Sequence, residues 1–139
     1  MNKIITLVII TMLTCFSIKA FADDEWDFAM PHKNRCSEGG QQPMNACLAK
    51  EYKKVDAKLN SEYKKLMSVL EDQSKLIKAQ KAWLSFRDLT CEYENSGIGK
   101  DGSLYSFAQA ACLIDLTEKR IRDIKQYLEW DCNGCPPRK

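Results

Sequence analysis

Six cysteines beyond residue 22 are the side chains best able to do chemistry in this chain: Cys36, Cys47, Cys91, Cys112, Cys132 and Cys135. They could form disulfides, bind zinc or, within the Cys132-Asn133-Gly134-Cys135 motif, exchange with other disulfides. Zinc needs four well-placed ligands, and His32 is the only histidine in the sequence. A redox CxxC normally opens a helix that lowers the thiol pKa, whereas this one follows a helical pattern and precedes two prolines. Disulfides are therefore the favoured interpretation, and we expect no metal and no other cofactor.

The N-terminal segment indicates the compartment in which these cysteines fold. Lys3 precedes an apolar run over residues 4–18, and Ala20-Phe21-Ala22 supplies the small residues that a signal peptidase requires. The run is too short to span a membrane comfortably, and the residues before Cys15 make a poor lipid-attachment box. We therefore predict a signal peptide over residues 1–22 and a periplasmic or secreted product with no membrane span. An even number of cysteines in an oxidising compartment is typical of disulfide-bonded proteins.

The charge composition excludes one large class of partners. The full chain has a formal net charge of +2. Lys3 and Lys19 leave with the predicted signal peptide, which contains no acidic residue, so the mature chain is neutral. Nucleic-acid-binding proteins normally carry a strongly basic surface, and we expect no nucleic-acid partner here. Lysines outnumber acidic residues between positions 50 and 65, which is typical of a solvated helix face.

Hydrophobic spacing predicts an all-α fold of three antiparallel helices. Pro43 suits the first position of one helix, and a break is expected at residues 71–74. A capping box at Ser106 and Gln109 predicts the start of the third helix, which ends near Trp130. The residues that recur at three- and four-residue steps are Tyr52, Leu59, Tyr63, Leu66 and Leu70, then Leu76, Ala79, Gln80, Trp83, Phe86, Arg87, Thr90 and Cys91, then Phe107, Ala111, Ile114, Ile121, Ile124 and Leu128. The predicted organisation is an irregular leader over 23–42, a helical domain over 43–130 and a short CxxC tail over 131–139.

Residues 95–103 form the clearest loop, because each of their three glycines would disfavour a helix interior by about 1 kcal/mol. Cys91 and Cys112 flank this loop and fall at similar heights on an antiparallel pair of helices. A bridge between them is therefore expected, and closing the loop would contribute ~3 kcal/mol. Cys36 is expected to join Cys47, and Cys132 to join Cys135 across a turn. Sequence alone leaves the other connectivities open.

The most distinctive string in the chain is Ala79-Gln80-Lys81-Ala82-Trp83-Leu84-Ser85-Phe86-Arg87-Asp88-Leu89-Thr90-Cys91. It occurs together with Met44-Asn45-Ala46-Cys47, Tyr52, Asp56, Leu59-Asn60, Tyr63, Gly102-Ser103, Cys112 and Leu116-Thr117-Glu118-Lys119-Arg120. In this order and spacing, the residues from about 36 to 128 resemble the LprI-like N-terminal domain family. That resemblance implies a small exported or lipid-anchored bacterial helical protein, and the namesake of the family is a lysozyme inhibitor. Cys36, Cys47, Cys91 and Cys112 match the family pattern, whereas Cys132 and Cys135 are an addition.

A polar network is expected between the helices. Gln80, Trp83 and Arg87 share one helical face, and a charge on an otherwise apolar face needs a partner because an unpaired buried charge is very costly. Asp56, on the first predicted helix, is the expected partner of Arg87. We interpret the network as fixing how the helices pack, with a binding role as the alternative. Its predicted members are Asp56, Gln80, Arg87, Thr117 and Arg120.

The sequence contains no recognisable catalytic constellation, so we predict that the protein is not an enzyme. His32 lies in the leader, and Gly97-Ile98-Gly99 follows a helix, unlike a phosphate-binding loop, which follows a strand. The favoured function, which export, the disulfide-braced helices and the family resemblance together suggest, is lysozyme inhibition through a loop that fills the cleft between two catalytic carboxyl groups. The alternatives are a periplasmic adaptor for another envelope protein or a toxin, and a minor redox protein that uses its CxxC. The candidate partner-binding residues are Ser96, Gly97, Lys100, Asp101 and Ser103.

Overall fold

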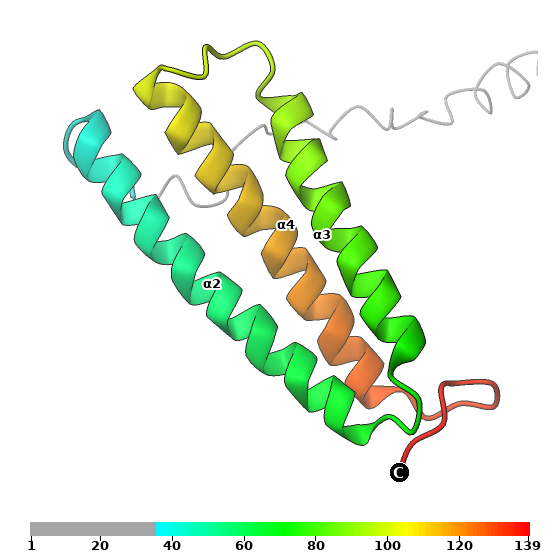
Figure 1. The fold of residues 1–139 in the computed structure, drawn as a ribbon. Helices are drawn as coiled ribbons and strands as arrows, with labels where there is room; N and C mark the ends of the chain where they lie inside the picture. Colours follow the sequence, from blue (N-terminus) through cyan, green and yellow to red (C-terminus); the bar gives the residue numbers. More distant parts are fainter. Residues whose placement is uncertain (1–35) are drawn as a thin grey trace, which may run out of the picture.

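The structure is a computed structural model that describes residues 36–139. This part of the chain forms three α-helices, α2 (Gln41–Val69), α3 (Ser74–Glu94) and α4 (Ser103–Glu129). α3 runs antiparallel to α2 and α4, which point in the same direction, and α4 lies between the other two helices in the view of Figure 1. The prediction of an all-α, three-helix fold is confirmed. The predicted signal peptide, His32 and the leader up to residue 35 lie outside the described residues.

The hydrophobic core lies mainly between α2 and α4. Its members recur at steps of three and four residues, which place them on one stripe of each helix. Removing such side chains from water is the dominant favourable contribution to folding. Most of the predicted aliphatic residues of these two helices are buried, whereas Tyr52, Tyr63 and Leu128 are only partly buried. The buried apolar residues of the two helices are Leu48, Val55, Leu59 and Leu66 on α2, and Phe107, Ala108, Ala111, Ile114, Ile121 and Ile124 on α4.

α3 packs against the other helices through a different set of residues. Its buried side chains are Gln80, Arg87 and Cys91. Phe86, by contrast, is 57% exposed, and Leu89 and Tyr93 are 64% and 79% exposed. The pattern that predicted this helix placed Phe86 among its packed positions, and that placement is wrong. Arg87 occupies the inward face, and adjacent residues of an α-helix are separated by about 100°, so the Phe86 ring is turned towards solvent.

The helix boundaries differ slightly from those expected. α2 begins at Gln41, before Pro43, and the proline still lies in the first turn, where its missing N–H has no intrahelical partner to lose. The predicted capping box at Ser106 is wrong, because α4 begins at Ser103 behind Gly102. The side chain of Gln109 instead accepts a hydrogen bond of 3.1 Å from Asn95 Nδ2.

Side-chain hydrogen bonds stabilise the turn between α2 and α3. Gln73 Nε2 donates to the carbonyl of Met67 near the end of α2 (2.7 Å). The Asp72 carboxylate accepts from the backbone N–H of Ser74 (2.8 Å) and from its hydroxyl (3.0 Å). These hydrogen bonds hold the pKa of Asp72 below its ordinary value of 3.8. The chain therefore turns here without the glycine or proline that usually marks such a break.

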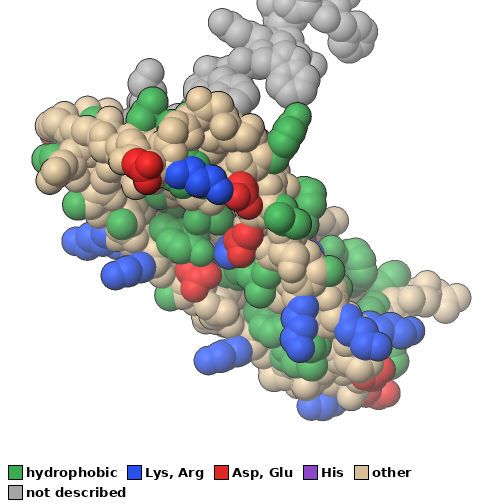
Figure 2. All heavy atoms as spheres, turned by 45° about the horizontal axis from the view of Figure 1, so that its top comes forward, with side chains coloured by type: hydrophobic (Ala, Val, Ile, Leu, Met, Phe, Trp, Pro, Cys, Tyr) green, Lys and Arg blue, Asp and Glu red, His purple; other side chains and the backbone are tan. Residues whose placement is uncertain are grey.

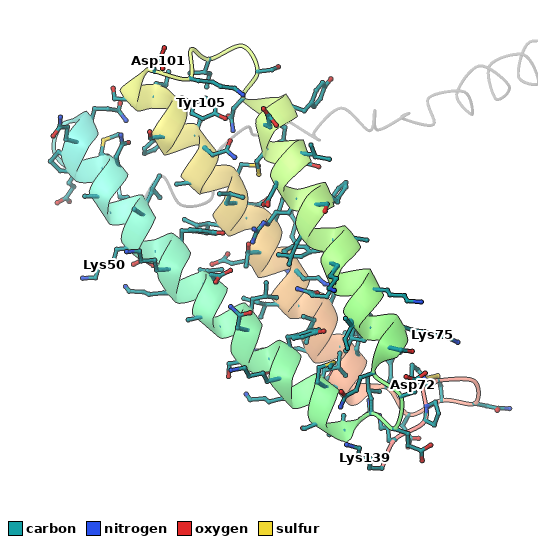
Figure 3. All side chains as sticks on the ribbon, in the orientation of Figure 1. Lys50, Asp72, Lys75, Asp101, Tyr105 and Lys139 are labelled. Carbon is teal, nitrogen blue, oxygen red and sulfur yellow. A yellow bond between two sulfur atoms is a disulfide. The ribbon has the colours of Figure 1, made fainter. Side chains whose placement is uncertain are left out.

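The C-terminal tail is tied to the ends of two helices. The backbone N–H of Lys139 donates to Val69 (3.0 Å) and that of Glu71 donates to Pro137 (3.1 Å). The Arg138 guanidinium donates to the carbonyls of Tyr127 and Leu128 at 2.6 and 2.9 Å. These are among the last carbonyls of α4, which lack the usual partner four residues later, although Tyr127 also accepts from the backbone N–H of Trp130 at 3.4 Å. Asp72, Lys75 and Lys139 mark this end of the bundle in Figure 3. Among the described helices, none has the length and apolar character needed to cross a membrane.

Candidate functional site

Three disulfides join the cysteines in the expected pairs. The bond between Cys36 and Cys47 ties the residues before α2 to its first turns, and the bond between Cys91 and Cys112 links α3 to α4, each with a Cα–Cα distance of 5.7 Å. The third joins Cys132 to Cys135 in the tail, with a Cα–Cα distance of 5.3 Å. This pair follows the C-terminal end of α4, so it lacks the helix N-terminus that activates a redox CxxC. Disulfides of this kind fit an oxidising location outside the cytoplasm.

A cluster of two arginines and three aromatic rings joins all three helices. We call it the arginine–aromatic cluster, and its members are Tyr52 on α2, Trp83 and Arg87 on α3, and Arg120 and Tyr127 on α4. The guanidinium carbons of Arg87 and Arg120 lie 5.4 and 5.7 Å from the Trp83 ring centroid. The same two carbons lie 5.8 Å from the rings of Tyr52 and Tyr127, respectively. Each contact is within the range of a cation–π interaction.

The polar partners of Arg87 include one that sequence reasoning did not identify. Arg87 Nε and Nη2 lie 2.9 and 2.8 Å from Asp88 Oδ1, whereas Asp56 Oδ1 is 3.9 Å from Nη1. Arg87 Nη1 also donates to Thr117 Oγ1 at 3.4 Å. The neighbouring Asp88 is thus the close partner, and the expected partner Asp56 lies at the limit of an ion pair. Burial raises the pKa of Tyr52, although the Arg87 guanidinium opposes this shift.

Arg120 is paired through a different group. Its Nε donates to Gln80 Oε1 at 3.0 Å, and Nη1 lies 3.8 Å from Asp123 Oδ2. The structure therefore brings the five predicted network residues together at the contact of the three helices. Gln80, Arg87, Thr117 and Arg120 are buried, whereas the Asp56 side chain is 41% exposed.

The loop between α3 and α4 is fixed at both ends. Asn95 is only 6% exposed, and its Nδ2 donates to the carbonyl of Cys91 (2.8 Å) and to Gln109 Oε1 (3.1 Å). At the far end, Asn45 Nδ2 donates to the carbonyl of Ser103 (2.9 Å). Sequence reasoning did not predict these contacts of Asn45, Asn95 and Gln109. The only available signal was that Asn95 follows Cys91 by one helical turn, which lets its side chain reach the Cys91 carbonyl.

The middle of the loop is exposed and built from two short turns. Backbone N–H groups of Ile98 and Gly102 donate to Asn95 and Gly99, each at 3.0 Å. Around Gly97 and Gly99, nothing lies within 4 Å of where a Cβ would be. The glycines therefore leave open space at the tip, so a partner can approach the backbone closely.

Lys100 does not extend freely from this loop. Its Nζ lies 2.6 Å from Oε1 of Glu92 on α3, and this hydrogen bond raises the pKa of Lys100 and lowers that of Glu92. Beside it is a polar hollow of about 400 Å³. Its lining residues are Gln42, Asn45, Lys100, Asp101, Gly102, Ser103 and Ser106. Figure 3 labels Asp101 and Tyr105 at this end of the bundle.

These features define a small helical protein that is braced by disulfides and presents an anchored polar loop at one end. Within residues 36–139, no group of three or more His, Cys, Asp or Glu side chains is arranged to hold a metal ion. The chain belongs to the LprI lysozyme inhibitor family, since the family described as lysozyme inhibitor LprI matches residues 33–124. It is also similar to an uncharacterized protein of Rhizobium meliloti (strain 1021), with 29% identity over 104 residues that cover 64% of this chain and 74% of that protein. No solved structure matches the chain significantly.

Proposed function

We propose that this protein is exported to the periplasm and inhibits a lysozyme by placing the loop Ser96–Ser103 in the substrate cleft of the enzyme. Family membership is the observation that carries this proposal. The anchored loop supports it, because a segment that is already ordered loses less conformational freedom on binding. The three disulfides support export, since such bonds persist in oxidising compartments.

The chemistry of the loop suits the cleft that it would enter. Lysozyme carries two carboxyl groups on either side of the bond that it cleaves. Hydroxyl groups of Ser96 and Ser103 and the exposed backbone of the glycines can replace the hydrogen bonds of a sugar ring. Lys100 supplies positive charge near the acidic groups, and Glu92 holds its ammonium beside the loop. Because the mature chain is neutral, we expect this local charge, and not long-range attraction, to select the partner.

A titration of the oxidised mature protein against lysozyme digesting cell walls tests the proposal. We expect lysis to fall as the protein reaches micromolar concentrations. Lys100→Ala and Ser103→Ala should each weaken inhibition by about tenfold or more, as expected of central contact residues. Lys139→Ala is the matched control, because it removes the same charge from the opposite end of the bundle (Figure 3), and it should inhibit normally.

Two results would contradict this proposal, the first its function and the second its contact surface. Unchanged lysis at micromolar protein, tested with lysozymes of different classes, would exclude inhibition and leave an adaptor for another envelope protein as the remaining function. Inhibition that persists in both loop variants would support the function but would show that the protein contacts lysozyme through a surface other than the loop.

A further inference from the structure

The second half of α3 exposes apolar side chains on its outward face, where an ordinary amphipathic helix is polar, while Leu76 and Trp83 pack inward against the core. The inward face of α3 also carries Gln80, Arg87 and Cys91. Phe86, Leu89 and Tyr93 follow one another by three and four residues, so they form one stripe. Counting about 100° per residue places this stripe opposite the buried side chains. We call Phe86, Leu89 and Tyr93 the α3 stripe, and Figure 2 shows apolar side chains gathered on the α3 side of the molecule.

The charges along α3 are arranged in two halves. Lys75, Lys78 and Lys81 precede the stripe, and all three are exposed. Asp88, Glu92 and Glu94 lie in the second half and are also exposed. A second copy of this helix, laid antiparallel across the first, would place each basic half against the acidic half of its partner. The surface is thus complementary to itself, as a two-fold symmetric interface must be.

The positions of the charges around the helix strengthen this argument. At about 100° per residue, Lys78, Lys81 and Glu92 fall on the same flank of the α3 stripe. In an antiparallel pair related by a two-fold axis near Phe86, that flank of one helix faces the same flank of the other. Glu92 of each copy therefore lies opposite position 80 of its partner, between Lys78 and Lys81, while the two Phe86 side chains meet at the axis.

We propose that two copies of this protein associate through their α3 helices, antiparallel, with Phe86 at the centre of the interface and Leu89 and Tyr93 of the two copies on either side of it. This inference goes beyond the proposed inhibition of lysozyme and does not depend on it. A contact confined largely to one helix per subunit falls at the low end of protein interface areas, so the dimer is weak and depends on concentration. The antiparallel arrangement leaves the two Ser96–Ser103 loops at opposite ends of the assembly.

Sedimentation of the oxidised mature protein over roughly 10–500 µM, the range in which a small interface associates, measures the dimer. Phe86→Ser should weaken association by about tenfold or more, since buried aromatic side chains dominate interfaces, and Leu89→Gln should act in the same direction. Leu104→Ser on α4 is the matched control, because Leu104 is a similarly exposed apolar residue at 52%. Circular dichroism checks that each variant keeps its helices.

A charge exchange tests the antiparallel arrangement. Lys78→Glu combined with Lys81→Glu makes one acidic variant, and Glu92→Lys makes a basic one. Each variant alone should associate less than the wild type, and an equimolar mixture should recover association as a mixed dimer. Because Glu92→Lys also removes the partner of Lys100, Lys100→Ala serves as its control and should dimerise normally.

The outcomes separate this proposal from the proposed function. A wild type that remains monomeric over the whole range overturns the dimer, and so does normal dimerisation of folded Phe86→Ser and Leu89→Gln. A mixture of the charge variants that stays monomeric overturns the antiparallel geometry. Loss of lysozyme inhibition in Lys100→Ala, with dimerisation intact, would leave the present inference standing on its own.

Discussion

Truncation of Arg87 should destabilise the protein by more than a surface charge can explain. The Arg87 side chain is 7% exposed, and its guanidinium lies over the rings of Trp83 and Tyr52. Two cation–π contacts contribute about 0.5–1 kcal/mol each, and the buried part of the stem contributes about 1–2 kcal/mol. Arg87→Ala should therefore lower the free energy of unfolding by about 3 kcal/mol, with the loss dominated by buried contacts because the Asp88 partner is largely exposed.

Urea denaturation with the disulfides intact measures this change. Arg87→Met keeps most of the stem volume and removes only the charge, so it should cost about 1–2 kcal/mol. Arg122→Ala is the matched control, because Arg122 is exposed on α4, and it should stay within about 0.5 kcal/mol of the wild type. If Arg87→Ala proves no more destabilising than Arg122→Ala, the arginine–aromatic cluster does not hold α3 in place and this reasoning is refuted.

Two further predictions concern the disulfides and acid stability. Replacing Cys91 and Cys112 together by serine should lower the free energy of unfolding by ~3 kcal/mol, measured by urea denaturation without reductant. An equal loss on replacing only Cys132 and Cys135 would contradict the expectation that a disulfide closing a longer loop stabilises more. The folded pKa of Asp72 lies below its ordinary 3.8, so its stabilising effect is present above that value and lost as the pH falls through the folded pKa. Asp72→Asn should therefore flatten the pH dependence of the urea midpoint between about pH 4 and pH 2, and an unchanged slope would exclude this role.

The core was predictable because its residues recur with helical spacing. The Cys91–Cys112 disulfide was predictable because the two cysteines flank a recognisable loop. Leu59 and Leu66 are seven residues apart, as are Ile114 and Ile121, and such spacing places each pair on one face of its helix. The glycines between Cys91 and Cys112 indicated where the chain turns back. Two cysteines that flank such a turn fall at similar heights on the antiparallel helices, so their side chains can meet.

The orientation of α3 was harder to predict from the sequence, because periodicity shows which residues share a helix face but not which face is buried. Gln80, Arg87 and Cys91 were expected on the packed face together with Phe86. The structure buries the first three, with Asp88, Thr117 and the ring of Trp83 as partners of Arg87, and it exposes Phe86. Those partners come from two helices, and no pattern within one segment of the sequence predicts that they meet Arg87.

The loop contacts were hidden for a related reason. The ion pair between Glu92 and Lys100 spans eight residues across a turn, and the hydrogen bond from Asn45 to Ser103 spans fifty-eight. Polar side chains at such separations carry no periodic signal. Ser106 and Gln109 matched a capping box by spacing alone, but Gln109 is engaged by Asn95.

The bond between Cys91 and Cys112 also determines the roll of α3 about its own axis. Cys91 lies on the same face of this helix as Gln80 and Arg87. Rotating α3 by half a turn about its axis to bury its exposed apolar side chains would move the Cys91 sulfur away from Cys112 and prevent the disulfide. Once the disulfide has formed, α3 can no longer rotate to bury Phe86, Leu89 and Tyr93 within its own chain.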